Sequence, residues 1–241
     1  MVVGGARKMI RIFVDTLAPG ELTIAGDEHH YASRVRRARA GDSIELIAPD
    51  GRRAVAAIAR ITADATIVAI DAISRPAPPM PYVQALLPLI KGDRMDTALE
   101  KLVEVGIDHI VVWPAERSVV KLERDKLDAR LDHYGKVLAA AARQSGAPEP
   151  TIAYAGSLRA VVLGLGDCAR LVLDGRAGRV AVPAAEAKIA VASGPEGGLA
   201  PAELDFLAAE RFVPFGLGPR VLRAETAPAI ATAIIRAATG T

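Results

Sequence analysis

Two glycine-rich stretches near the C-terminus carry the residue types best suited to holding a nucleotide-like ligand. The first, KIAVASGPEGGLAPAEL at 188–204, places the segment GPEGG (194–198) between an apolar run and a helix expected to begin near Pro201. Because glycine has no Cβ, the backbone there can approach a ligand and offer its N–H and C=O groups to a purine edge or a carboxylate. A tight turn would use the same glycines, so this stretch alone leaves both interpretations open.

The second stretch, FGLGPRVLRAETA at 215–227, adds charge to the same kind of backbone. Arg220 and Arg223 bring two guanidinium groups, and an apolar helix follows. Thr226 is expected to cap that helix and Glu225 to interact with its positive end. Two such loops on adjacent strand ends predict a pocket for a nucleotide-like ligand.

Alternating strands and helices are needed to position these loops, and residues 82–241 show that alternation. Asp93 is expected to cap the first helix, and Gly106 to end it in the left-handed conformation. Because the helices separate the strands, the strands should pair in parallel within an α/β domain. The strands are expected at 82–90, 109–113, 171–174, 189–192 and 211–215, and the helices at 93–105, 123–145, 157–163, 201–210 and 226–238.

The N-terminal part reads differently, as short β-rich segments separated by turns. We expect strands at 10–15, 43–47, 54–61 and 65–70, and one helix from Asp27 to Gly41. This pattern predicts a small β-barrel. The expected helix contains four arginines within one stretch of six residues, namely Arg34, Arg36, Arg37 and Arg39. Such a cluster fits phosphate contact or a solvated helix face.

A proline-rich segment separates the two parts. Ser74 to Pro81 reads SRPAPPMP, and proline both fixes φ and removes the donor N–H, so neither a sheet nor a helix can continue there. We expect an N-terminal domain at 1–75 with a ragged extension at 1–8, a linker at 76–81 and a second domain at 82–241.

Composition narrows the class of protein. The chain has 241 residues, a net charge of +2 and one cysteine, Cys168, which excludes an intramolecular disulfide framework and a multi-cysteine metal cluster. No apolar run reaches the length of a membrane span, and charges interrupt the N-terminal apolar stretch before a signal peptide can form. A soluble, cytoplasmic protein without a metal site is expected.

Several motifs in order give the chain a family resemblance. GPEGG followed by LGPRVLRAETA resembles the signature of the RsmE family, the 16S ribosomal RNA (uracil-N3)-methyltransferases of the SPOUT class. HHYASRVRR at 29–37, KGDRMDTALEKLVEVGI at 91–107 and ERSVVKL at 116–122 are similar to further family segments. RQSGA at 143–147 departs from the family pattern, and Ala200 stands where a helix-capping Ser or Thr is common. The first departure affects the expected RNA contacts, not the cofactor loops.

The resemblance implies a fold, a cofactor and a site. The fold would be a PUA-like N-terminal RNA-binding barrel joined to a SPOUT domain with a parallel sheet and a deep trefoil knot, acting as a homodimer. The cofactor would be S-adenosylmethionine. It would be bound by residues of three loops, namely Leu173, Asp174, Gly175, Gly194, Pro195, Glu196, Gly197, Gly198, Leu217, Gly218, Val221, Leu222, Arg223, Ala224, Glu225 and Thr226.

The expected substrate is a uridine of 16S ribosomal RNA within the small subunit. Uracil N3 carries a proton at neutral pH, so the reaction needs a base or a cation that stabilises the imidate. Arg223 is the candidate for that cation, with Arg117 or Arg143 from a partner subunit, although Arg223 could simply pair with Glu225. The expected RNA contacts are His29, His30, Arg34, Arg36, Arg37, Lys91, Arg94, Arg117 and Arg143.

Two other functions fit parts of the sequence. A non-catalytic RNA-binding or ribosome-assembly factor could retain the fold, but it would not need intact glycine loops. A dinucleotide-dependent oxidoreductase would carry G-x-G-x-x-G after the first strand of its α/β domain. Here Lys91-Gly92-Asp93 follows that strand instead.

Overall fold

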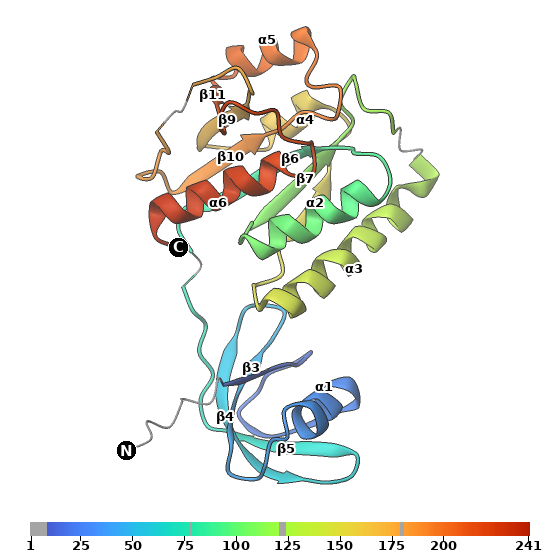
Figure 1. The fold of residues 1–241 in the computed structure, drawn as a ribbon, viewed down its shortest axis with the longest axis vertical. Coiled ribbons are helices and arrows are strands. Elements are labelled where there is room, and N and C mark those ends of the chain that lie inside the picture. Colours follow the sequence, from blue (N-terminus) through green and yellow to red (C-terminus); the bar gives the residue numbers. More distant parts are fainter. Residues whose placement is uncertain (1–8, 78, 121–123, 179–180) are drawn as a thin grey trace. The chain divides into compact units, whose positions relative to one another are not determined.

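The computed structural model describes residues 9–77, 79–120, 124–178 and 181–241. The chain divides into two compact units, residues 1–77 and 78–241 (Figure 1), and the division falls within the proline-rich segment. No helix in the described ranges is long and apolar enough to cross a membrane.

The N-terminal unit is built on one five-stranded sheet in the order β1-β3-β4-β5-β2. Its inward positions, among them Ile12, Ile44 and Val68, form a core of their own. Strand β1 pairs in parallel with β3, and the other neighbours are antiparallel. The strands are β1 (Ile10–Phe13), β2 (Gly20–Ala25), β3 (Ser43–Ile47), β4 (Arg53–Ile61) and β5 (Ala65–Ile70).

The helix of this unit is shorter than the sequence indicated. Helix α1 (Gly26–His30) continues as one π-helical segment, η1 (Tyr31–Val35), and ends well before Gly41. Arg37 adopts the left-handed conformation with φ of 53°, which stops the helix. Asp27 lies in the first turn instead of capping it. The prediction of one helix from Asp27 to Gly41 was therefore wrong in its end and in its cap.

The second unit contains a six-stranded sheet in the order β11-β9-β10-β6-β7-β8, and every pairing in it is parallel. The predicted α/β fold with a parallel sheet is confirmed. Strand β8 was not predicted. The strands are β6 (Tyr82–Pro88), β7 (His109–Trp113), β8 (Thr151–Tyr154), β9 (Ala169–Leu173), β10 (Lys188–Ala192) and β11 (Val213–Phe215).

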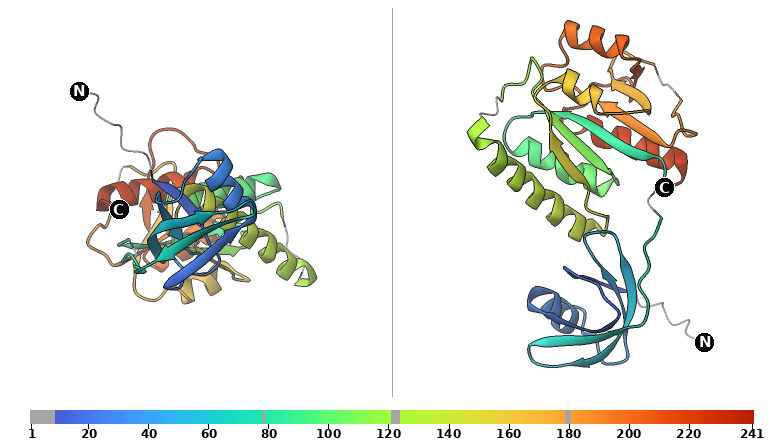
Figure 2. Two further views of the ribbon diagram at one scale, coloured as in Figure 1. Left: turned by 90° about the horizontal axis from the view of Figure 1, so that it is seen from below. Right: turned by 180° about the vertical axis from the view of Figure 1, so that it is seen from behind.

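Helices cover both faces of this sheet (Figures 1 and 2). On one face α2 (Asp93–Glu104), α3 (Leu127–Ser145) and α6 (Ala227–Thr239) bury their apolar sides in a shared core. On the other, α4 (Leu158–Leu163) and α5 (Pro201–Ala209) enclose a second core. A one-turn 3-10 helix at 124–126 precedes α3. Gly106 follows α2 with φ of 82°, as predicted, whereas the N-cap of α2 is Gly92, so Asp93 is its first residue.

Arg236, near the end of α6, ties this helix to the amino ends of two central strands. Its Nε and Nη2 donate to the carbonyl of Gly106 at 2.9 and 2.7 Å, and its Nη1 donates to the carbonyl of Pro81 at 2.7 Å. Nη2 also reaches Asp108 Oδ2 at 2.5 Å, and the Arg236 side chain is only 6% exposed. Burial raises the pKa of Asp108, although the backbone N–H of Val83 and Arg236 favour its ionised form.

Removing this guanidinium should destabilise the unit. Arg236→Ala leaves two carbonyls and the Asp108 carboxylate without their buried donor, and we expect unfolding free energy to fall by about 3 kcal/mol or more. Urea unfolding measures the change. Arg130→Ala, on the exposed side of α3, is the control and should stay within about 0.5 kcal/mol of the wild type. Equal unfolding free energies for the two variants would contradict this role for Arg236.

Candidate active site

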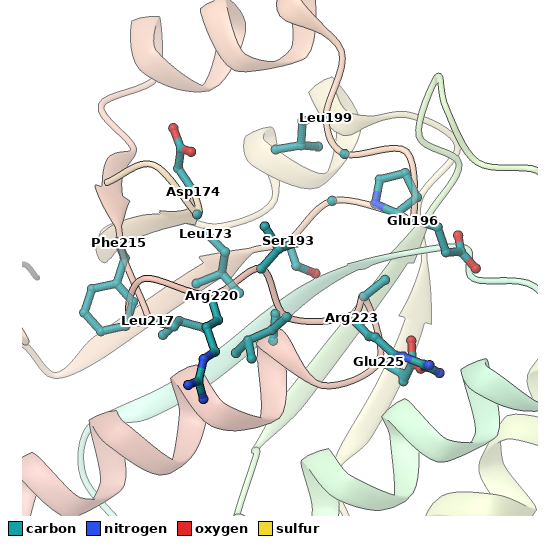
Figure 3. Close-up of a pocket in the computed structure, with 18 of the residues that line it drawn as sticks. Leu173, Asp174, Ser193, Glu196, Leu199, Phe215, Leu217, Arg220, Arg223 and Glu225 are labelled. Atoms are coloured by element: carbon teal, nitrogen blue, oxygen red, sulfur yellow. The ribbon is translucent and has the colours of Figure 1, made fainter. Parts of the chain in front are cut away.

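One cavity of about 610 Å³ opens where β9, β10 and β11 end (Figure 3). In open parallel sheets ligands bind outside the carboxyl ends of the strands, so this is the expected position for a site. The lining residues come from three loops and the first turns of three helices, α2, α5 and α6. They are Arg94, Leu173, Asp174, Gly175, Arg176, Ser193, Gly194, Pro195, Glu196, Gly198, Leu199, Leu204, Phe215, Leu217, Gly218, Arg220, Val221, Leu222, Arg223, Ala224, Glu225 and Ala227.

The loop after β10 is folded tightly enough to require glycine. A Cβ on Gly194 would lie 2.9 Å from the backbone N of Leu199 and 3.1 Å from the carbonyl carbon of Gly198. The N–H of Gly198 donates to the carbonyl of Pro195 at 2.8 Å, and Gly198 has φ of 71°. The missing side chains therefore let the loop turn on itself beside the cavity and present its backbone there.

The loops after β9 and β11 pack against each other backbone to backbone. A Cβ on Gly216 would overlap the carbonyl oxygen of Ala177 and would lie 2.7 Å from that of Gly178. The N–H of Asp174 also approaches the carbonyl of Phe215 at 3.4 Å. These contacts join two of the cavity walls into one structure. No feature of either segment alone indicates them.

Charges on the cavity wall are mostly paired with one another. Asp174 Oδ1 accepts the backbone N–H of Arg176 at 2.9 Å and its Nε at 3.3 Å. The backbone hydrogen bond is the largest cause of a lowered pKa of Asp174, and the guanidinium adds to it. Glu196 Oε1 accepts the N–H of Lys91 at 3.4 Å and lies 3.6 Å from Nη1 of Arg94. The start of α2 is thereby linked to the glycine loop.

Arg117 is also held at this loop. Its Nη1 donates to the carbonyls of Gly197 and Leu199 at 3.1 and 3.5 Å. A Cβ on Gly197 would lie 3.2 Å from the Cβ of Arg117. The three predicted RNA contacts Lys91, Arg94 and Arg117 thus gather around the loop at 194–198.

Glu203 connects the segment that carries Arg117 with the start of α5. Its Oε2 accepts the N–H of Ala200 at 2.8 Å, and its Oε1 accepts the N–H of Glu116 at 2.8 Å. Ala200, at the N-cap, has no side-chain oxygen of its own, so Glu203 provides the available half of a capping box. The spacing of Ala200 and Glu203 is the sequence signal that could have indicated this.

Losing this carboxylate should loosen both segments. Glu203→Ala leaves two backbone N–H groups without acceptors, and we expect unfolding free energy to fall by about 1–2 kcal/mol. Glu203→Gln keeps one acceptor oxygen and should lose about half as much. Urea unfolding of both variants measures the difference. A Glu203→Ala protein as stable as the wild type would show that the two contacts are not significant.

Arg223 and Glu225 lie side by side on the loop before α6, while Arg220 points away from them (Figure 3). Nη1 of Arg223 is 3.7 Å from Oε1 of Glu225, and the side chains are 76% and 9% exposed. Oε2 of Glu225 is buried without a hydrogen-bond partner. Thr226 occupies the N-cap position of α6 as predicted, but its side chain makes no capping bond. The pairing of Arg223 with Glu225 is long and leaves the guanidinium largely free in solvent.

The cavity includes most of the residues predicted to bind a cofactor. Gly197 and Thr226 are the two that do not line it. The glycine loops could not indicate the side chains that complete the wall from neighbouring positions. These are Arg94, which was predicted as an RNA contact, Arg220, which lies within the predicted loop, and the unpredicted residues Arg176, Ser193, Leu199, Leu204, Phe215 and Ala227.

The two histidines of the N-terminal unit differ in accessibility. His29 is 7% exposed, and its ring nitrogens lie 2.9 Å from Oγ1 of Thr66 and 3.1 Å from the carbonyl of Ala63. His30 is exposed. The RNA contact of His29 stays a prediction, and it is disfavoured because both ring nitrogens already have partners within the unit.

The predicted basic surface of this unit is accessible. Arg34, Arg36 and Arg37 are exposed, and Arg34 and Arg39 line a hollow of about 410 Å³. In the other unit, Arg143 is exposed in the last turn of α3 and does not line the cavity at the strand ends.

Known proteins are similar to this chain in sequence. A family model described as an RNA methyltransferase domain matches residues 78–236. Ribosomal RNA small subunit methyltransferase E of Mycobacterium tuberculosis is 34% identical over 233 residues, which are 91% of this chain and 88% of the relative. The protein of that name from Bacillus subtilis is 29% identical over 228 residues, 88% of each chain.

Two solved structures with bound cofactor have the same fold. Ribosomal RNA small subunit methyltransferase E of Neisseria gonorrhoeae, bound to S-adenosyl methionine, has a TM-score of 0.77 at 24% identity and covers 95% of this chain and 98% of its own. A methyltransferase of Legionella pneumophila in complex with the cofactor SAM has a TM-score of 0.75 at 26% identity and covers 96% and 98%.

Proposed function

Because the chain belongs to the ribosomal RNA small subunit methyltransferase E family, we propose that it transfers the methyl group of S-adenosylmethionine to N3 of a uridine in 16S ribosomal RNA. The observation that carries this proposal is the cavity at the carboxyl ends of β9, β10 and β11, which three loops enclose. Two of these loops have glycines at positions where a Cβ would collide with the backbone.

The cavity suits an adenosyl cofactor in size and chemistry. A volume of about 610 Å³ lies within the range of small-molecule sites. Leu173, Leu199 and Leu217 line the cavity and would contact a purine, and the backbone of Gly194 and Gly218, which also line it, would meet the polar edge of that purine. The cofactor supplies an electrophilic methyl group on a sulfonium. The residues of the three loops would hold it, as the sequence predicted.

The protein's own contribution to the reaction is alignment and charge. Uracil N3 must lose a proton, and negative charge then spreads over the imidate. Arg223, whose side chain lines the cavity and is 76% exposed, would stabilise that charge. Arg117, which donates to carbonyls of the loop at 194–198, would contact the RNA. Arg143 of a second subunit would contact it as well. N3 lies on the Watson–Crick edge, so the uridine must be unpaired or splayed out.

The finer features of the fold belong to the same proposal. We infer a PUA-like barrel in the N-terminal unit, with His30, Arg34, Arg36 and Arg37 facing RNA, and a trefoil knot in the second. The backbone contact between Gly216 and Ala177 supports two segments crossing closely there. The protein would act in the cytoplasm on the small subunit.

A homodimer is also proposed. Val221 on the cavity loop is 92% exposed and Ile230 on α6 is 40% exposed, and burying such apolar groups favours association. Sedimentation velocity should give the mass of two chains. A monomer at micromolar concentration would contradict the dimer without affecting the assignment of the cofactor.

Methylation mapping tests the reaction itself. Small-subunit RNA from cells lacking the protein should lose one N3-methyluridine, and the purified protein with S-adenosylmethionine should restore it. A non-catalytic binding or assembly factor predicts no restoration. An unchanged pattern of N3-methyluridine in those cells would overturn the proposed substrate. An oxidoreductase is disfavoured because the segment after β6 lacks a G-x-G-x-x-G motif.

A further inference from the structure

The carboxylate of Glu225 has an unusual environment. The residue is 7% exposed and lines the cavity. Its Oε2 is inaccessible to solvent and has no hydrogen-bond partner, and within the described ranges the indole N–H of Trp113 is the only other buried side-chain polar atom in that state. Burying a carboxylate oxygen without a partner destabilises the folded protein, and a positively charged ligand in the cavity would offset that cost.

The other two carboxylates of the cavity are already used. Asp174 accepts two donors from Arg176, and Glu196 is engaged with Lys91 and Arg94. Glu225 alone among the three has a buried oxygen without a hydrogen-bond partner within the described ranges. A bound cation would therefore find its uncompensated negative charge at Glu225.

Local positive charge compensates Glu225 only weakly. The nearest guanidinium atom, Nη1 of Arg223, is 3.7 Å from Oε1, beyond hydrogen-bond distance, and the Arg223 side chain is 76% exposed. Solvent screens an exposed guanidinium, so such a pair contributes little. The amino end of α6 follows directly and adds about half a unit of positive charge. Neither effect gives the Glu225 carboxylate a direct hydrogen-bonded counter-charge.

We propose that Glu225 is the counter-charge of the cofactor's sulfonium and makes the cavity prefer the charged methyl donor over its neutral product. This inference rests on the proposed function. The covered Oε2 cannot accept a hydrogen bond from a ligand unless the wall moves, whereas a sulfonium has no hydrogen to donate. The two groups can still attract through a few ångströms of low-dielectric protein.

Charge selection would help turnover. Once the methyl group leaves, the sulfur becomes a neutral thioether and its attraction to Glu225 disappears. S-adenosylhomocysteine keeps every other group of the donor, including its ammonium and carboxylate. The product should therefore bind less tightly than the donor, and the difference should depend on Glu225.

Calorimetric titration of Glu225→Gln with three ligands tests this inference. Glutamine preserves the shape and removes the charge, so affinity for S-adenosylmethionine should fall about tenfold or more. Sinefungin, in which an amine-bearing carbon replaces the sulfonium, should weaken in parallel. Affinity for S-adenosylhomocysteine should stay within about twofold of the wild type, which also reports a folded cavity. Glu225→Asp retains the charge and should retain most of the preference.

Glu196→Gln is the matched control, because its carboxylate lines the same cavity but already has partners. It should change the affinities for donor and product by the same factor. Equal weakening of both ligands by Glu225→Gln, or no weakening of either, would overturn the role of Glu225. Failure of the wild-type protein to bind any of the three ligands would instead overturn the proposed function.

Discussion

Replacing Arg223 with alanine should lower methyl transfer about 100- to 1,000-fold, the usual effect of removing one donor that stabilises a developing anion. The guanidinium is 76% exposed and only loosely paired with Glu225, so it is available to a uracil at the cavity mouth. Arg223→Lys keeps the charge and loses the planar fork, and should recover part of the rate. Single-turnover transfer of a labelled methyl group to 16S ribosomal RNA measures both variants.

Cofactor binding separates a catalytic Arg223 from one that holds the loop. Affinity for S-adenosylmethionine should stay within about threefold of the wild type in both variants, because the exposed guanidinium does not support the loop. Arg220→Ala is the control, because Arg220 lies on the same loop but points away from Arg223 and Glu225 (Figure 3). The rate of methyl transfer by this variant should fall much less. If Arg223→Lys transfers methyl groups at the wild-type rate and Arg223→Ala does not, the positive charge alone is sufficient. If both variants transfer at the wild-type rate while they bind the cofactor, Arg223 has no catalytic role.

Gly194→Ala should weaken S-adenosylmethionine binding about 100-fold or more, because displacing a ligand-bearing backbone by about 1 Å has effects of that size. The added Cβ would lie 2.9 Å from the backbone N of Leu199. No side-chain rotation can relieve a contact with backbone, so the loop at 194–198 must shift. Calorimetry gives the affinity, and methyl transfer should fall with it.

Gly135→Ala is the control that separates the collision of the new Cβ with backbone from the general effect of replacing glycine by alanine. Gly135 lies within α3, and a Cβ there would meet nothing within 4 Å. Gly135→Ala should leave cofactor affinity unchanged and stabilise the unit by about 0.5–1 kcal/mol, because alanine favours a helix. Wild-type affinity in Gly194→Ala would contradict the tight fold of this loop.

The sequence was most informative where function restricts the backbone. Glycine at 194–198 and 216–218 indicated close backbone approach, and both loops lie at the cavity. What could not be predicted is which backbone comes close. Gly216 meets residues 177 and 178, about 40 positions earlier in the chain, and only the assembled sheet brings them together. Periodicity within either loop carries no information about that contact.

Errors in the N-terminal unit have local physical causes. The arginine-rich segment has helical composition, but Arg37 at φ of 53° ends the helix, and single non-glycine residues in that conformation leave no composition signal. Strand β2, at the edge of the sheet, was not predicted. It begins with Gly20, and glycine has a low propensity for strands. His29 was expected to contact RNA because HHYASRVRR resembles a family segment, whereas its ring hydrogen-bonds within the unit. Pattern alone cannot distinguish a buried polar ring from an exposed one.

Direct photocrosslinking of radiolabelled S-adenosylmethionine, followed by peptide mapping, is the most direct test of where the methyl donor binds. Attachment within residues 173–176, 193–199 or 215–227, competed by unlabelled donor and lost in Gly194→Ala, is the predicted result. Saturable attachment to another surface, such as the hollow of about 590 Å³ near Arg170 and Glu210, would contradict the cavity as the cofactor site. Absence of any saturable attachment, together with no binding heat, would contradict the use of this cofactor.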